Sequence, residues 1–204
     1  MLNHSPNYTL VKTGLFFGSF NPIHNGHLAI ANYIVDFTEV DELWFVVSPQ
    51  NPLKEKDILA PDYHRLEMVK KAIPFNENRM LICDIEMNMP KPSYTIDTLR
   101  VLGAKYPDKE FIIILGSDSL ESITKWKEYN TLINDYKIFI YPRKGSNMSE
   151  LTSKYPVKKI NAPLFDFSST SVREKLINGD DVSMYIPEDV LKYINKTGIY
   201  QLKK

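Results

Sequence analysis

The chain repeats one pattern along its length: a short apolar run, a polar turn, and then a stretch with helical periodicity. The apolar runs cover residues 10–18, 42–48, 79–86, 111–116, 137–143 and 157–163. Several of them are apolar on consecutive residues, as in FIIIL at 111–115. Consecutive apolar residues are typical of strands covered on both faces, so the pattern predicts a parallel sheet between two layers of helices.

The stretches between the apolar runs predict helices over residues 26–37, 61–73, 95–106, 169–178 and 187–196. Pro107 ends the third of these helices and Gly179 ends the fourth. Alternating strands and helices with right-handed crossovers indicate an α/β fold with a Rossmann-like, doubly wound parallel sheet and helices on both faces. Ligands of such folds bind at the carboxyl ends of the strands, so each polar segment after a strand is a candidate part of a site.

Composition excludes several classes of protein. The 204 residues suffice for one domain with its own core. Residues 1–12 are expected to form a loose extension at its N-terminus. The 25 basic and 25 acidic residues cancel, which argues against a dedicated nucleic-acid or membrane-surface binder. Without a long apolar segment or a signal-peptide core, a cytoplasmic location is expected. The single cysteine, Cys83, excludes an intrachain disulfide and favours a buried apolar role.

The segment GSFNPIHNGH, residues 18–27, has more features than a turn requires. Gly18 lets the backbone approach a ligand, and Gly26 lies at a helix start, where N–H groups and the dipole favour an anion. His24 and His27 are three residues apart, so they face the same way and can donate to phosphate oxygens. A capping loop with surface histidines and a metal-binding pair are the alternatives, but phosphate binding accounts for more of the pattern.

Two polar segments follow the second and third strands. In SPQNPLK, residues 48–54, Lys54 either points into the site or is a solvated surface lysine. In MPKPSYTIDTL, Ser93 or Thr95 is expected to cap the next helix. Tyr94 and Thr95 are also candidates for contact with a ligand.

The fourth strand ends in GSDSL, residues 116–120. Asp118, after Gly116, is placed like the acidic group that holds a ribose hydroxyl in nucleotide-binding folds, and a helix N-cap is the alternative. Trp126 in TKWKEY either stacks on a flat ring or covers the core.

Basic and hydroxyl-bearing residues follow the last strands. Arg143 can meet a phosphate, whereas the apolar-poor segment 144–153 is expected to be a solvated loop. The segment FSSTSVREKL, residues 167–176, offers four adjacent hydroxyls and Arg173 at a helix start. Ser171 and Glu174 fit a capping box, and the whole set predicts a polyphosphate cradle.

These segments resemble the HxGH nucleotidyltransferases. GSFNPIHNGH is similar to their GGTFDPxHxGH signature, and FSSTSVR is similar to ISSTxIR. SYTIDTL, GSDSL and KW occur in the order found in one branch, bacterial nicotinate-nucleotide adenylyltransferase. The resemblance covers nearly the whole chain. It implies transfer of AMP from ATP to nicotinate mononucleotide, with Mg²⁺, giving deamido-NAD and pyrophosphate in NAD biosynthesis.

The resemblance also implies residue roles. The implied catalytic residues are His24, His27, Lys54 and Arg173. The residues implied to bind ATP are Gly18, Ser19, Phe20, Gly26, Gly116, Asp118, Arg143, Ser168, Ser169 and Thr170. Trp126 would stack on the pyridine ring, and Thr95 would recognise its carboxylate. Tyr94 and the backbone of Lys127 would lie beside them.

Three positions depart from the family pattern: Phe17 replaces the first glycine of GGTF, Asn21 replaces its aspartate, and Leu53 replaces the histidine of PPHK. The rival functions are the same transfer to nicotinamide mononucleotide or phosphopantetheine, and a nucleotide-binding sensor that has lost catalysis. The retained histidines, Lys54 and Arg173 argue against the sensor. Neither a nucleic acid nor a membrane is expected as a partner, and a homo-oligomer is an open alternative.

Overall fold

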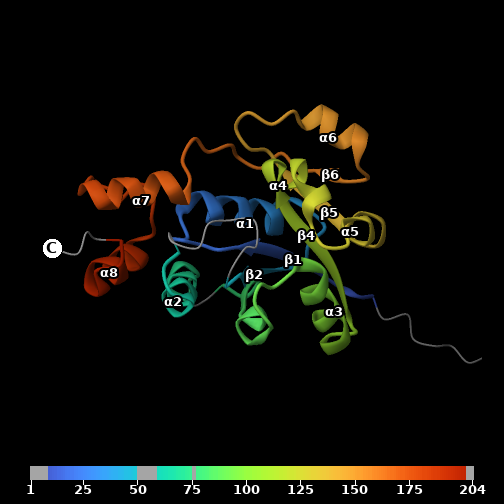
Figure 1. Ribbon diagram of the computed structural model, residues 1–204, viewed down its shortest axis with the longest axis horizontal. Helices are drawn as coiled ribbons and strands as arrows, with labels where there is room; N and C mark the ends of the chain where they lie inside the picture. The colour runs from blue at the N-terminus through green and yellow to red at the C-terminus, as the bar shows by residue number, and fades with distance from the viewer. Residues whose placement is uncertain (1–8, 50–58, 75–76, 201–204) are drawn as a thin grey trace, which may run out of the picture.

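The strands form a parallel sheet with helices on both sides, as the sequence predicts (Figure 1). The computed structural model describes residues 9–49, 59–74 and 77–200. Their six-stranded sheet is parallel and has the order β3-β2-β1-β4-β5-β6. Its strands are β1 (Val11–Gly18), β2 (Glu42–Val47), β3 (Met80–Cys83), β4 (Lys109–Gly116), β5 (Lys137–Tyr141) and β6 (Lys158–Lys159). The order reverses between β1 and β4, the switch point at which doubly wound sheets bind ligands.

Helical segments connect the strands and follow the last one. The α-helices are α1 (Asn25–Phe37), α2 (Asp62–Ala72), α3 (Thr95–Lys105), α4 (Ser117–Glu121), α5 (Tyr129–Asp135), α6 (Met148–Lys154), α7 (Ser169–Asn178) and α8 (Glu188–Thr197). Two 3₁₀ turns, η2 (Ile85–Asn88) and η3 (Ile123–Lys125), follow β3 and α4. The five helices predicted from periodicity are confirmed as α1, α2, α3, α7 and α8, and α8 packs beside α2 (Figure 1).

Side chains of the sheet alternate between two buried cores. On one face, Phe16 of β1 packs in a core that includes residues of α1, α2, α7 and α8. On the other face, Leu15 packs in a core that includes residues of α3, α4, α5 and α6. Helices therefore cover both faces, which confirms the doubly wound fold and explains why the strands are apolar on consecutive residues.

Three local predictions were wrong. Residues 144–153 include most of α6 rather than forming a loop, because the Asn147 side chain caps the helix by accepting from the Glu150 N–H and Leu151 is buried. The third strand ends at Cys83, since η2 begins at Ile85. The last apolar run forms only the short edge strand β6, which pairs with β5.

Cys83 is buried, as predicted, and burial raises the pKa of its thiol to about 11. Within the described ranges, no helix is long and apolar enough to cross a bilayer.

Candidate active site

Two pockets adjoin at the carboxyl ends of β1 and β4. The His24 pocket, named after one of its lining residues, has a volume of about 650 Å³, and the Trp126 pocket has a volume of about 330 Å³. The residues that line both are Phe17, Gly18, Ser19, Asp118, Ser119 and Tyr141. Molecules bound in the two pockets would therefore meet across the ends of β1 and β4.

The predicted site residues divide between these pockets. The His24 pocket is lined by Gly18, Ser19, Phe20, His24, His27, Asp118, Arg143, Ser168, Ser169, Thr170 and Arg173. The Trp126 pocket is lined by Gly18, Ser19, Tyr94, Thr95, Gly116, Asp118, Trp126 and Lys127. Gly26 lines neither pocket and lies against His24. Lys54 and Leu53 lie outside the described residues.

His24 and His27 form a capping box at the start of α1, in which the ring of each residue accepts the backbone N–H of the other. Nδ1 of His24 accepts the His27 N–H at 3.3 Å, and Nδ1 of His27 accepts the His24 N–H at 3.2 Å. The rings stack with their centroids 3.6 Å apart. A ring nitrogen that accepts an N–H carries no proton, so these bonds assign the proton of each neutral ring to Nε2. Each ring can therefore cap the helix with one nitrogen and donate with the other.

The surroundings of His24 keep its ring neutral. Burial and the nearby charge of Arg143 lower the pKa of His24 to about 3. Gly26 leaves room for this ring, because a Cβ at that position would lie a tight 3.1 Å from Nδ1 of His24. At neutral pH, His24 is a neutral hydrogen-bond donor at the N-terminus of α1.

Some of the hydroxyls at the start of α7 form hydrogen bonds within the protein. Ser168 is the N-cap and forms a capping box with Ser171, so the predicted box of Ser171 and Glu174 was wrong. Ser169 Oγ donates to the carbonyl of Pro22 at 2.9 Å. Arg173 donates to the carbonyl of Asn21 at 2.7 Å and to Thr170 Oγ1 at 3.3 Å. These bonds fix the hydroxyl-bearing segment, residues 167–176, against the histidine-bearing segment, residues 18–27.

Asn21, a departure from the family pattern, joins the motif to other parts of the chain. Its side chain is buried, and Oδ1 accepts from the Tyr200 hydroxyl at 2.5 Å and from the Ala60 N–H at 3.1 Å. Burial raises the pKa of the Tyr200 hydroxyl, which keeps that donor protonated. Phe17, the other described departure, lines both pockets.

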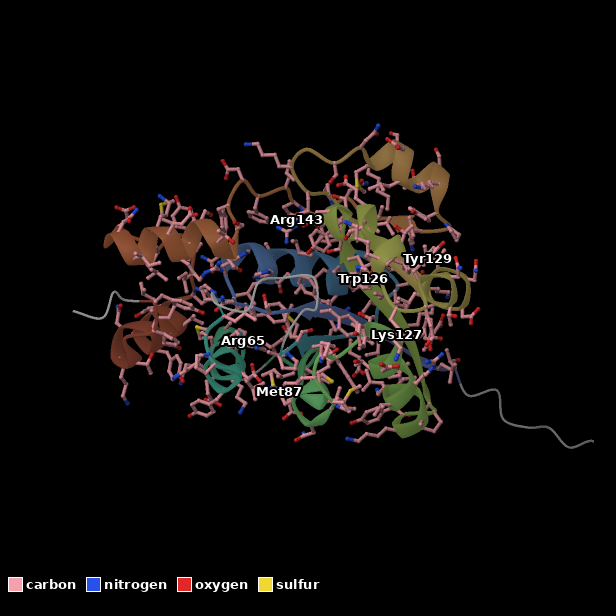
Figure 2. The ribbon with its side chains drawn as sticks, in the orientation of Figure 1. Arg65, Met87, Trp126, Lys127, Tyr129 and Arg143 are labelled. Carbon is pink, nitrogen blue, oxygen red and sulfur yellow. The ribbon has the colours of Figure 1, made fainter. Side chains whose placement is uncertain are left out.

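Arg65 is a residue that the sequence argument missed. Its fully buried guanidinium donates hydrogen bonds to the carbonyls of Ser19, Ser48, Pro49 and Ala60 and to the carboxylate of Asp62. Arg65 therefore joins the ends of β1 and β2 to the start of α2, where Figure 2 labels it. Its place among polar residues on a helix with few apolar positions gave no signal of this role.

The Trp126 pocket lies beside the N-terminus of α3. Neither Ser93 nor Thr95 caps that helix, contrary to the prediction; Tyr94 is the N-cap and forms no side-chain capping bond. Ser93 instead donates to Glu86. Nζ of Lys127 lies 2.8 Å from Oδ2 of Asp97 on α3, and Figure 2 labels Lys127 beside this helix and Trp126 nearer to Arg143. The side chain of Lys127 thus holds the segment that contains Trp126 against α3.

Asp118 stands at the boundary of the two pockets. It is the second residue of α4, so it is not the N-cap, a position that Gly116 occupies. Its Oδ1 lies 3.9 Å from Nε of Arg143. A Cβ on Gly116 would lie only 2.4 Å from that same oxygen, so a side chain at this position would displace the Asp118 carboxylate from where it lies.

Among the described residues, no group of three or more histidine, cysteine, aspartate or glutamate side chains is placed to hold a metal ion.

Comparisons with known proteins show the family to which this chain belongs. Residues 15–175 match the model of the cytidylyltransferase-like family. A Flavobacterium psychrophilum protein named "probable nicotinate-nucleotide adenylyltransferase" is 39% identical over 193 residues, which cover 94% of this chain and 100% of that protein. A Bacteroides fragilis protein of the same name is 43% identical over 183 residues, which cover 90% of each.

A solved structure shares the fold. The Plasmodium falciparum nicotinic acid mononucleotide adenylyltransferase complexed with NaAD superposes with a TM-score of 0.79 at 24% identity, covering 93% of this chain and 97% of that one. The family match and the relatives extend over most of the chain, and they confirm the resemblance inferred from the motifs. The chain belongs to the cytidylyltransferase-like family and, within it, to the nicotinate-nucleotide adenylyltransferases.

Proposed function

We propose that this protein transfers the adenylyl group of ATP to nicotinate mononucleotide, forming deamido-NAD and pyrophosphate in NAD biosynthesis. The observation that carries the proposal is the wall shared by the two pockets. Donors and cations suited to a triphosphate line one pocket, whereas an uncapped helix start and an indole line the other. ATP in the His24 pocket and the mononucleotide in the Trp126 pocket would meet at this wall.

The reaction needs little acid–base chemistry from the protein. The acceptor's 5′-phosphate is largely ionised at neutral pH, since its second pKa is about 6, and it can attack without a general base. One of its oxygens bonds to the α-phosphorus as the bond to the β-phosphate oxygen breaks, and the pyrophosphate leaves with that electron pair. Catalysis then requires alignment of the phosphates and neutralisation of their charge.

The proposed roles follow from this requirement. His24 and His27 donate from Nε2 to the phosphates of ATP, where charge increases during transfer. Arg143 and Arg173 supply positive charge on the same pocket. The hydroxyls of Ser168 and Thr170 and the N-terminus of α7 complete the proposed triphosphate cradle. Ser169, whose hydroxyl donates to the Pro22 carbonyl, lines the same pocket at this helix start.

Asp118 is proposed to hold a ribose hydroxyl, because it lies at the boundary between the pockets. Lys54, Ser19, Phe20 and Gly18 keep the roles implied by the resemblance. Mg²⁺ is proposed to arrive with ATP as the substrate complex, where it neutralises phosphate charge.

The N-terminus of α3 favours an acid over an amide on the pyridine ring. The backbone N–H groups of Thr95 and Ile96 make no hydrogen bond within the described part of the chain. They carry the positive end of the helix dipole, which attracts a carboxylate. Thr95 itself lines the Trp126 pocket, and stacking on Trp126 would place the ring beside it.

Pyrophosphate release tests the proposal. The purified protein is given Mg-ATP with nicotinate mononucleotide, nicotinamide mononucleotide or phosphopantetheine. We expect the highest kcat/KM with nicotinate mononucleotide. Preference for another acceptor would overturn the substrate assignment, and ATP binding without release from any acceptor would favour the sensor. An ATPase signal without acceptor is subtracted as the matched control.

A further inference from the structure

The wall of the Trp126 pocket contains a buried carboxylate that the transfer reaction does not use. Glu86 lies in η2, directly after β3, and only 2% of its surface is exposed. Its Oε2 accepts from Ser93 Oγ at 2.7 Å, and its Oε1 accepts from Thr98 Oγ1 at 2.8 Å. Both hydroxyl-bearing residues are buried as well.

The two partners of Glu86 lie on either side of the start of α3. Ser93 precedes the N-cap residue Tyr94, and Thr98 is the fourth residue of the helix. Between them, the Tyr94 carbonyl accepts the N–H groups of Asp97 and Thr98 at 3.0 and 3.1 Å. One carboxylate therefore fixes the chain before the helix start and the end of the first turn.

The two hydrogen bonds of Glu86 fix the start of α3 in place of a side-chain cap. A capping hydroxyl fixes a helix start by accepting one of the free N–H groups, which then cannot bind a ligand. Here the hydroxyl of Ser93 donates to Glu86 instead, so the helix start is held without using the N–H groups of Thr95 and Ile96. A helix end that is both rigid and uncapped is suited to receive an anion.

We propose that Glu86 is a positioning residue for the acceptor: by holding Ser93 and Thr98, it orients the free N–H groups of α3 that take the carboxylate of the pyridine mononucleotide. The proposal rests on the proposed function for the identity of that anion. Glu86 acts through α3 and does not touch the reacting phosphates, so its loss should affect the acceptor and spare ATP.

Glu86→Gln is the direct test, because glutamine fills the same space but has only one accepting oxygen and no charge. Asp84→Asn is the matched control, since it makes the same change two residues away on an exposed side chain. Ser93→Ala and Thr98→Val each remove one donor and leave the carboxylate. They keep the test available if Glu86→Gln fails to fold.

Two measurements are made on each variant. In the ligand-free protein, hydrogen exchange of a peptide containing residues 93–98 should be faster in Glu86→Gln than in wild type or Asp84→Asn. In steady-state assays, the KM for nicotinate mononucleotide should rise about tenfold in Glu86→Gln and about threefold in each hydroxyl variant, whereas the KM for ATP stays within about twofold.

The outcomes separate the two proposals. Unchanged exchange would show that Glu86 does not hold the start of α3, and an equal rise in both KM values would show that its role is purely structural; either result would overturn this inference. A wild-type protein that releases no pyrophosphate with nicotinate mononucleotide would overturn the proposed function. In that case, the exchange measurement alone would decide whether Glu86 holds the start of α3.

Discussion

Mild acid should destabilise this fold through His24. Its pKa in the folded protein is about 3, against 6.5 for an ordinary histidine. Protons therefore bind the unfolded chain first, and the stability associated with the neutral ring, complete above pH 6.5, is lost as the pH falls through that value towards 3. Between about pH 7 and pH 5, this one group removes about 2 kcal/mol from the free energy of unfolding.

The measurement is urea unfolding of wild type and His24→Asn at both pH values. Asparagine is a good N-cap residue, so the variant can retain a helix cap while losing the titrating ring. Carboxylates common to both proteins cancel in the difference between their free energies of unfolding. We expect the wild type to lose about 2 kcal/mol more than the variant. Equal losses would refute the depressed pKa.

Three further variants test the site. His27→Ala should lower kcat by a factor on the order of 10²–10³ and stability by only about 1 kcal/mol, and near-normal turnover would contradict its role. Trp126→Ala should raise the KM for the mononucleotide about tenfold, with Trp126→Phe restoring most of the affinity, whereas equal KM values in the two variants would argue against ring stacking. Arg65→Lys keeps the charge but loses the fork of donors, so calorimetry should show a loss of about 3 kcal/mol; an unchanged Tm would oppose the anchoring role.

The layers of the fold were readable from the sequence because each strand is buried on both faces. A run such as FIIIL in β4 has no polar face, and this left few arrangements other than a covered parallel sheet. Short elements were harder to predict. The helix α6 buries Leu151 but has few other apolar positions, and its only clear signal was Asn147 with Glu150 three residues later.

The pockets were predictable in outline because strand-end loops of a doubly wound sheet converge. His24 follows β1, and Asp118 and Trp126 both follow β4. The structure places His24 in one pocket, Trp126 in the other, and Asp118 at the boundary of the two. Glu86 was missed because its partners lie across an irregular turn, 7 and 12 residues further along the chain, and Arg65 because some of its partners are distant in sequence. Arg65 binds the carbonyl of Ser19, 46 residues away, and no local pattern encodes that contact.

The spacing of the two histidines has a structural reason as well as a chemical one. A capping box joins the N-cap and the third residue of a helix, which are the positions of His24 and His27. A serine–glutamate pair could make the same two bonds, but it would leave no ring N–H to offer a phosphate. Imidazole has a second nitrogen on the far side of its ring, so each histidine can satisfy the helix and still donate. A shift of either histidine by one residue would break both functions together, which gives a physical reason for the interval of three residues between them.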